Sequence, residues 1–410
     1  MTVTDLRRKS SDRLGRYYTA HEVGQLLVSQ MKTGRPKTII DLGAGGGALA
    51  VAAANRWNES DILTIDVDGK SVEMLGENKQ ISGRYQHIRV NALDTKLPER
   101  IRVFSDSVDV GVCNPPFIMP KWRKDYLEIL KSAGFNKIPS VNRYIEAPAL
   151  FFAQNMRILS DGGQLGIILP DSLISSARYR WFREELLEKY RINKVIRLPR
   201  GSFTGTDALA YIITLEKNSP GKNIQLSSFD GTSVADKCLV SKDEAAIRMD
   251  GEFHCAGKIE RKIGKYKHTL QLDSEAIRRG SFENAIVAKR GCNVLHTKDL
   301  LREDLGKWVH LDPIFQETLS RLNSKSAVIA GPGDILIARV GRNLDEKVIG
   351  VASGYAYITD CIYRIRVPIK FRSRLLSALS SELGRAWIAA NSYGVSARQL
   401  PKSALMGFEY

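Results

Sequence analysis

The sequence predicts an α/β fold in its N-terminal half, a doubly wound sheet, with a second domain of the α+β class after it. Three observations support the first part. An apolar run at residues 38–42 ends in a glycine turn that opens an alanine-rich helix, a second run ends in Asp66, and a third, at residues 110–113, stops at an Asn-Pro-Pro turn. Strands that alternate with helices in this way are typical of a parallel sheet that binds a ligand at its carboxyl edge.

The composition indicates a folded protein with a basic surface. The chain has 410 residues, a length that suits two or three domains, and it combines a formal charge of +16 with 43% hydrophobic residues. An excess of positive charge is typical of a nucleic-acid binder, although a basic surface without any ligand would have the same composition.

Other classes are disfavoured by what the sequence lacks. It contains no run of about 18 apolar residues and no signal-peptide core, so we expect a cytoplasmic protein without a membrane partner. The cysteines are scattered and show no metal-ligand spacing, so we expect reduced thiols and no metal site. They are Cys113, Cys238, Cys255, Cys292 and Cys361.

A helix is predicted near the N-terminus. Thr19 has the position of an N-cap, and Glu22 stands three residues later, where a capping box needs it, so the helix should continue along residues 23–31. Tyr17 and Tyr18 precede the cap, where they either pack the helix against the core or contact a ligand.

The turn after the first strand is the first candidate binding element. Asp41, Gly43, Gly45 and Gly47 occupy a strand-to-helix connection in which the backbone can approach a ligand closely. Asp66 ends the second strand, and one carboxylate can accept hydrogen bonds from both hydroxyls of a ribose. The pattern therefore predicts a dinucleotide or another adenosine derivative as cofactor.

A third strand and its loop are expected at residues 87–94. Asn91 or Asp94 would contact the adenine ring of that cofactor. An ordinary turn asparagine and a solvated loop carboxylate explain the two residues equally well.

The fourth strand delivers a rigid polar loop. Asn114 can accept through its side-chain oxygen, and Pro115 has a carbonyl group without a competing N–H. Phe117 offers a flat apolar face, so the loop suits a planar ring that carries an exocyclic amino group. An ordinary turn followed by a core phenylalanine would look the same in isolation, but the order of the upstream elements favours a site.

These motifs, taken in order, resemble the gamma-class adenine-N6 DNA methyltransferases, which include type I modification subunits and stand-alone type II enzymes. The resemblance covers most of residues 12–217 and implies a Rossmann-like domain that binds S-adenosylmethionine. In that family the tyrosine-threonine segment and the glycine loop hold the cofactor, the acidic residue binds its ribose, and the Asn-Pro-Pro-aromatic loop holds a flipped adenine. Phe117 stands where the family more often has tyrosine, and Asn91 where aspartate is usual.

The rest of this half fits the same pattern. We expect helices at residues 146–159 and 181–190 and strands at 163–170, 195–199 and 208–215. Phe203 lies in the glycine-flanked loop at residues 200–207 and is expected to be exposed. By similarity to the family it would form the second aromatic wall, sandwiching the adenine against Phe117.

The C-terminal half is expected to read the DNA sequence. Residues 218–247 are predicted to be a linker with connecting strands, and residues 248–410 resemble the target-recognition domains of type I specificity subunits. Strands are expected at residues 287–291, 333–341 and 358–367, and a helix at 383–388. Arginines beside glycines suit phosphate contact or guanine reading, or else form a solvated basic surface. The candidates are Arg290, Arg339, Arg342 and Arg398.

The sequence thus predicts a site-specific DNA adenine-N6 methyltransferase, with residues 1–217 as the catalytic domain. The chain begins almost at its first motif, so we expect no fused nuclease, and any cognate endonuclease would be a separate chain. Because the chain carries its own reading domain, a monomer acting on double-stranded DNA is expected. The alternatives are an RNA adenine or protein glutamine methyltransferase and a catalytically silent DNA-binding subunit.

Overall fold

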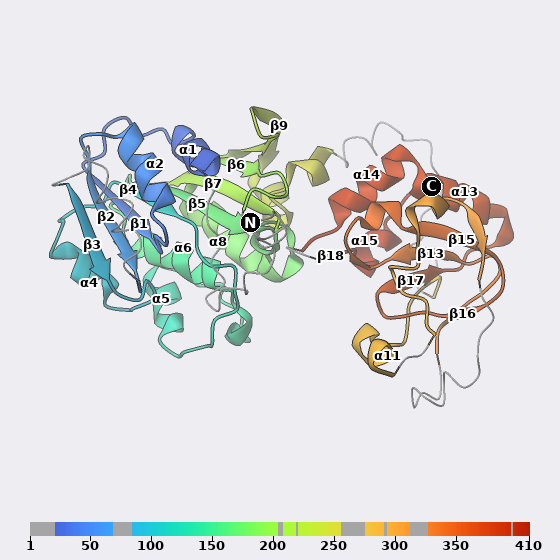
Figure 1. Cartoon of the computed structure of the whole chain (residues 1–410). Coiled ribbons are helices and arrows are strands. Elements are labelled where there is room, and N and C mark those ends of the chain that lie inside the picture. Colours follow the sequence, from blue (N-terminus) through green and yellow to red (C-terminus); the bar gives the residue numbers. More distant parts are fainter. Residues whose placement is uncertain are drawn as a thin grey trace, which may run out of the picture. The chain divides into compact units, whose positions relative to one another are not determined.

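The structure is a computed structural model of the chain that describes residues 21–68, 84–203, 208–218, 220–255, 275–290, 293–311, 327–394 and 397–410. It divides into two compact units, Met1–Gly251 and Glu252–Tyr410 (Figure 1). No helix among these residues combines the length and the apolar character needed to cross a bilayer.

The first unit is built on a nine-stranded sheet with the order β3-β2-β1-β4-β5-β7-β6-β8-β9. The pairs that join β3, β2, β1, β4 and β5 are parallel, and β7 is inserted antiparallel between β5 and β6. The strands are β1 (Thr38–Leu42), β2 (Asp61–Asp66), β3 (Tyr85–Arg89), β4 (Val110–Cys113), β5 (Gln164–Pro170), β6 (Arg191–Arg197), β7 (Ala210–Glu216), β8 (Asn223–Phe229) and β9 (Val234–Ser241). This topology confirms the predicted α/β class.

Helices cover both faces of this sheet (Figure 1). On one face α1 and α2 pack together, because their valine, leucine and alanine side chains join a core with Ile168, Ile196 and Ile212 of the sheet. The other face holds α6, of which all but the last two residues are buried. The helices are α1 (His21–Ser29), α2 (Ala48–Arg56), α4 (Leu97–Arg102), α5 (Tyr126–Ser132), α6 (Ala147–Ile158), α7 (Asp171–Ser175), α8 (Arg180–Lys189) and α9 (Lys242–Ile247).

Residues 218–247, predicted to be a linker with connecting strands, do contain strands, but the segment belongs to the first unit. Strand β8 pairs in parallel with β6, and β9 closes the sheet beside it. Ile224 and Leu226 of β8 face the core, and the polar residues that alternate with them lie on the other face. Because of these polar residues the segment resembles a linker in sequence. The guanidinium group of Arg183, fully buried in α8, then holds the carbonyl groups of Ala246 and Ile247 at 3.0 and 2.7 Å.

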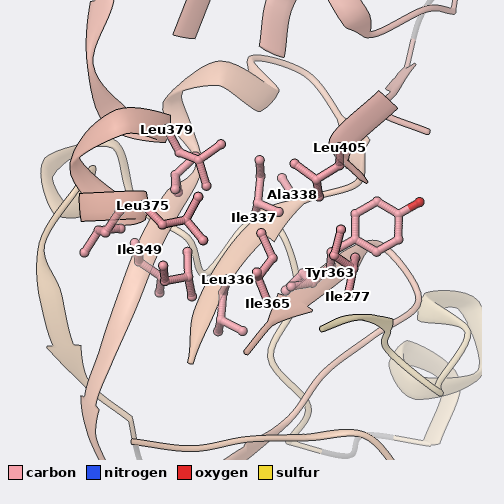
Figure 2. Close-up of a cluster of buried hydrophobic side chains, with 14 of the residues drawn as sticks. Ile277, Leu336, Ile337, Ala338, Ile349, Tyr363, Ile365, Leu375, Leu379 and Leu405 are labelled. Atoms are coloured by element: carbon pink, nitrogen blue, oxygen red, sulfur yellow. The ribbon is translucent and has the colours of Figure 1, made fainter. Parts of the chain in front are cut away.

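The second unit has a five-stranded sheet with the order β10-β17-β13-β15-β11. Figure 2 shows its core, where side chains of β13, β15 and β17 meet leucines of α13. Its main elements are β10 (Ile277–Arg279), α11 (Asn284–Arg290), β11 (Trp308–His310), β13 (Ile335–Ala338), β14 (Val340–Gly341), β15 (Val348–Ser353), β17 (Ile362–Ile365), α13 (Ile369–Ser380), α14 (Glu382–Asn391), β18 (Arg398–Gln399) and α15 (Lys402–Met406). The combination of sheet and helices is of the predicted α+β type.

Two predicted strands of this unit differ in the structure. Residues 287–290 of the segment expected as a strand at 287–291 lie in the helix α11, where Val287 packs into a small core with Phe282 and Tyr357 while Ile286 stays exposed. Residue 291 lies outside the described residues. The strand expected at 358–367 is shortened to β17. The strand expected at 333–341 appears as β13 and β14, and the predicted helix at 383–388 lies within α14.

The core of the second unit gives a stability prediction. Ile337 of β13 is fully buried, whereas Ile369 at the start of α13 is 80% exposed. Ile337→Ala should lower the free energy of unfolding of this unit by about 2–5 kcal/mol, because it leaves a cavity in a packed core. Ile369→Ala should change it by less than about 0.5 kcal/mol. Urea denaturation of both variants checks this, and equal effects would contradict the assigned core.

Candidate active site

The candidate site lies where the order of the sheet reverses. Strand β1 pairs in parallel with β2 on one side and with β4 on the other, so Asp41 stands opposite both Thr64 and Val112. The loops that follow the three strands therefore open at the same edge of the sheet. Doubly wound sheets bind their ligands at this crevice.

The turn after β1 requires glycine. Gly43, Gly45 and Gly47 have φ angles of 81°, 54° and 81°, in the left-handed region. A Cβ atom on Gly43 would also lie 2.8 Å from Cε1 of Phe151 in α6. The N–H groups of Gly43 and Ala44 donate to the Ile65 carbonyl at 2.7 and 3.1 Å, which ties the turn to β2.

Asp66 connects β2 to this turn. Its Oδ2 accepts from the Gly45 N–H at 2.8 Å and its Oδ1 from the Asp68 N–H at 3.2 Å. The carboxylate is buried at the end of β2 and still lines the cavity described below. A fixed carboxylate with spare lone pairs suits recognition of a diol.

Asp41 is a second buried carboxyl group beneath the turn. Its Oδ2 accepts from the Ala50 N–H at 3.1 Å, and among the described residues its Oδ1 has no hydrogen-bond partner. Burial raises the pKa of the Asp41 carboxyl to about 7, with the Ala50 N–H opposing the rise and the Asp66 charge adding to it. A buried acceptor without a partner is uncommon and fits a ligand that brings a donor.

One cavity of about 560 Å³ joins these elements. It is lined by Asp41, Gly43, Ala44, Gly45, Gly46, Ala48, Leu49, Asp66, Val67, Asn91, Ala92, Leu93, Asn114, Pro116, Ile118, Pro120, Lys121, Arg123, Tyr126, Ala147 and Phe151. Its size suits a small organic ligand.

Of the two residues predicted to contact an adenine ring, only Asn91 lines this cavity. Its Oδ1 accepts from the Leu93 N–H at 2.9 Å and shapes the loop. Asp94 instead accepts from the Lys96 N–H and forms an ion pair with Arg100 at 3.3 Å.

The loop after β4 reaches the same cavity. Asn114 is half-buried and lines it together with Pro116, while Pro115 is buried and does not. The Ile118 N–H donates to the Pro116 carbonyl, and the Ile118 carbonyl accepts from the Ala147 N–H at 2.9 Å. These bonds hold the loop against the start of α6.

Phe203 is buried, contrary to the expectation that it is exposed. It is 2% exposed because it joins the core formed by α1, α2 and the sheet. The rings of Phe203 and Phe117 lie 6.2 Å apart, centroid to centroid, at 74°. The structure brings the two predicted aromatics together, but in an edge-to-face contact that leaves no slot between parallel faces for a base.

The other predicted site residues fall in different surroundings. Tyr17, Tyr18 and Thr19 lie outside the described residues, as does the side chain of Arg290. Arg339 is 8% exposed and donates to the Asp360 carbonyl, so its guanidinium group is occupied inside the second unit. Arg398 donates to the Ala389 and Ser392 carbonyl groups at the end of α14, each at 2.7 Å. Arg342 is exposed in the turn after β14.

Sequence reasoning missed the cavity residues from helices α5 and α6. Tyr126 and Phe151 line the cavity, and no motif marks either of them because each lies within an ordinary apolar helical stretch. Their contribution depends on packing. Among the residues that the structure describes, no group of three or more histidine, cysteine, aspartate or glutamate side chains could hold a metal ion.

The burial of Asp41 gives a pH prediction. The unfolded chain loses this proton near the ordinary pKa of 3.8 and the folded chain near 7, so the folded state binds more protons in between. The free energy of unfolding should therefore fall as pH rises through this window, on the order of 4 kcal/mol in total. Asp41→Asn should remove this part of the slope. Asp106→Asn, at an exposed position, should retain it, and an unchanged slope in the Asp41 variant would contradict the assignment.

Comparison with known proteins identifies the family. The family model described as N-6 DNA Methylase matches residues 2–238, more than half of the chain. A type II methyltransferase, M.BsuBI of Bacillus subtilis, is 26% identical over 47% of this chain and 40% of its own length. A tRNA1(Val) (adenine(37)-N6)-methyltransferase of Flavobacterium psychrophilum is 29% identical over 33% of this chain and 53% of its own length. The chain thus spans about half the length of these relatives.

A solved structure shows the same fold. The type IIG restriction endonuclease BpuSI aligns with 97% of this chain and 59% of its own chain, with a TM-score of 0.51 and 14% identity. The first unit has the S-adenosylmethionine-dependent methyltransferase fold, and the chain belongs to the N-6 DNA methylase family.

Proposed function

We propose that the protein is a site-specific DNA methyltransferase that transfers a methyl group from S-adenosylmethionine to N6 of an adenine flipped out of duplex DNA. The observation that carries this proposal is the single cavity lined by the glycine turn, Asp66 and Asn114. It joins the elements expected to hold a cofactor to the loop expected to hold the target base. The ordered motifs support the gamma class in particular.

The residues of the cavity suit S-adenosylmethionine, which supplies an activated methyl group when bound. Asp66 would accept from the ribose hydroxyls and Asn91 would contact the adenine ring. The Oδ1 atom of Asp41, which lacks a partner among the described residues, would accept from a donor of the ligand. The positive-φ glycines remove the side chains that would otherwise fill this space.

The Asn114 loop would act on the adenine amino group. That nitrogen is a poor nucleophile because its lone pair is delocalised into the ring. The Asn114 side-chain oxygen and the Pro115 carbonyl would accept its two N–H bonds, which favours a pyramidal nitrogen with its lone pair directed into the cavity. In-line transfer needs positioning more than acid–base work, so no general base is assigned. S-adenosylhomocysteine would leave, and the proton lost by the methylated nitrogen would pass to solvent. Phe117 would stack on the extruded base and offset part of the cost of unstacking it.

The second unit is proposed as a target-recognition domain, and double-stranded DNA as the partner. Its DNA contacts would include Arg290 and the exposed Arg342. Arg339 and Arg398 are left out because their guanidinium groups donate to backbone carbonyls. We further propose that the protein is the modification part of a restriction-modification system whose endonuclease is a separate chain. We also propose that it acts as a monomer.

One observation favours a second candidate function. The tRNA methyltransferase relative, whose name gives adenine N6 as its target, matches 33% of this chain. RNA adenine is therefore the alternative substrate. A release factor glutamine methyltransferase of Fusobacterium nucleatum, 30% identical over 31% of this chain, extends the choice to protein glutamine.

The cofactor assignment predicts the effect of one carboxylate. Asp66→Asn should weaken S-adenosylmethionine binding roughly 10- to 100-fold, because a charged acceptor for the ribose hydroxyls is removed. Asp61→Asn changes the same residue type at the exposed opposite end of β2 and should bind as wild type does. Isothermal titration calorimetry measures both, and normal affinity in the Asp66 variant would remove this residue from the site.

The reaction is tested by expressing the protein in a host that lacks adenine methylation and sequencing its DNA by a long-read method that scores modified bases. Wild type and the control Asn218→Ala should place N6-methyladenine at one short motif, and Asn114→Ala should place none. Asn218 lies past the end of β7, at the opposite edge of the sheet. If the genome stays unmodified and a labelled methyl group is transferred to RNA or to protein in vitro, the RNA adenine or the protein glutamine alternative would replace the proposal. DNA binding without any transfer would indicate a silent subunit.

A further inference from the structure

The segment that joins β4 to α6, residues 118–146, forms part of the cavity wall. Its Ile118, Lys121, Arg123 and Tyr126 line the cavity. The hydrogen bond from the Ala147 N–H to the Ile118 carbonyl, at 2.9 Å, ties its two ends together. The segment therefore begins and ends beside the loop that carries Asn114.

The cations of this segment fall into two groups. Arg123 pairs with Asp125, and Lys137 with Glu184 at 3.6 Å and with Glu188. In contrast, four cations are exposed and pair with no carboxylate among the described residues: Lys121, Lys124, Lys131 and Arg143. Exposed cations without counter-charges attract the phosphates of a nucleic acid.

An exposed aromatic residue stands beside the last of these cations. The side chain of Tyr144 is 47% exposed, and the guanidinium carbon of Arg143 lies 4.8 Å from its ring centroid. The Tyr144 carbonyl accepts from Arg178 and from the Tyr179 hydroxyl, which lies at 3.2 Å. The tyrosine is thus held on a fixed backbone although its ring is open to solvent.

A second layer of bonds supports this backbone. Arg178 approaches Oε1 of Glu146 at 3.3 Å, and Oε2 of the same carboxylate accepts from the Ser172 hydroxyl at 2.7 Å. The Glu146 N–H donates to the Tyr179 hydroxyl at 2.8 Å. An ordered surface that presents cations and an aromatic ring suits a strand with both phosphates and bases.

We infer that the segment at residues 118–146 is a DNA-contact surface of the first unit itself. Lys121, Lys124 and Arg143 contact phosphates of the strand that carries the target adenine, and Tyr144 stacks on an unpaired base. The inference rests on the proposed function and deepens it, because it assigns part of the DNA contact to the unit that holds the cavity.

The cations are tested by the salt dependence of binding to a fluorescein-labelled duplex of mixed sequence, measured by anisotropy with the full chain. The triple variant Lys121→Ala, Lys124→Ala, Arg143→Ala should bind more weakly. The slope of log K against log salt concentration should shrink by about 0.9 for each phosphate that the variant no longer neutralises, up to about 2.7 in total.

A matched control removes the same number of charges elsewhere. Arg35→Ala, Lys37→Ala, Lys222→Ala alters exposed residues just before β1 and β8, at the amino ends of parallel strands and so at the opposite edge of the sheet. It should keep the wild-type slope. A Lys121→Arg, Lys124→Arg, Arg143→Lys variant should also keep it, which separates loss of charge from damage to the fold.

Tyr144 is tested with a single-stranded DNA oligonucleotide of mixed sequence. Tyr144→Ala should bind it roughly 5- to 150-fold more weakly with the salt slope unchanged, and Tyr144→Phe should bind as wild type does.

The outcomes separate this inference from the proposed function. If the wild type methylates DNA but the triple variant and its control have equal slopes, residues 118–146 are not the DNA-contact surface, and the proposed function is unaffected. If the wild type neither binds nor methylates DNA, the proposed function fails and the inference fails with it. Tighter binding to RNA of the same sequence, with the same reduction of slope in the triple variant, would overturn the assignment to DNA.

Discussion

The candidate site depends on the parallel pairing of β1 with two neighbours. Asp41 is opposite Thr64 in β2 and Val112 in β4. Two residues beyond this common line stand Gly43, Asp66 and Asn114, so three distant segments deliver their functional residues to one edge. Because side chains alternate along a strand, a register shift of one residue would turn Asp66 or Asn114 away from the cavity. The hydrogen bond from the Gly45 N–H to Asp66 at 2.8 Å then locks two of the three loops together.

The sequence predicts this part of the site because its signals are local. A glycine turn between a strand and a helix, or an acidic residue that ends a strand, can be recognised from a few consecutive residues. The cavity walls formed by α5 and α6 cannot be recognised in this way, because Tyr126 and Phe151 reach the cavity only through the packing of their helices. The sequence could not decide between Asn91 and Asp94 for the same reason. The two residues are close in sequence, and only the folded loop shows which of them faces the cavity.

The differences from prediction also have a common physical origin in tertiary packing. Phe203 has the glycine neighbours of an exposed loop residue, yet apolar side chains of the sheet and of helices α1 and α2 surround it. Arg339 looks like a phosphate ligand in sequence, yet Asp360 engages it inside the second unit. The local sequence indicates which interactions a side chain is able to make. The partners that occupy it come from other segments of the fold, as the Asp360 carbonyl does for Arg339 and the carbonyl groups at the end of α14 do for Arg398.

The distribution of charge is consistent with two ligands of opposite sign in one site. The chain carries a formal charge of +16, yet the charged groups beneath the glycine turn are the carboxyls of Asp41 and Asp66. Burial, with the charge of Asp66 adding to its effect, favours a proton on Asp41, and a ligand with a positive centre would favour the ionised carboxylate instead. The exposed cations of residues 118–146 favour phosphates instead. In the proposed function the cationic cofactor belongs beside the carboxyls and the polyanionic DNA beside the lysines. Asn114 lines the same cavity as Asp41, Asp66 and Lys121, so the proposed ligands of opposite sign would meet at one cavity.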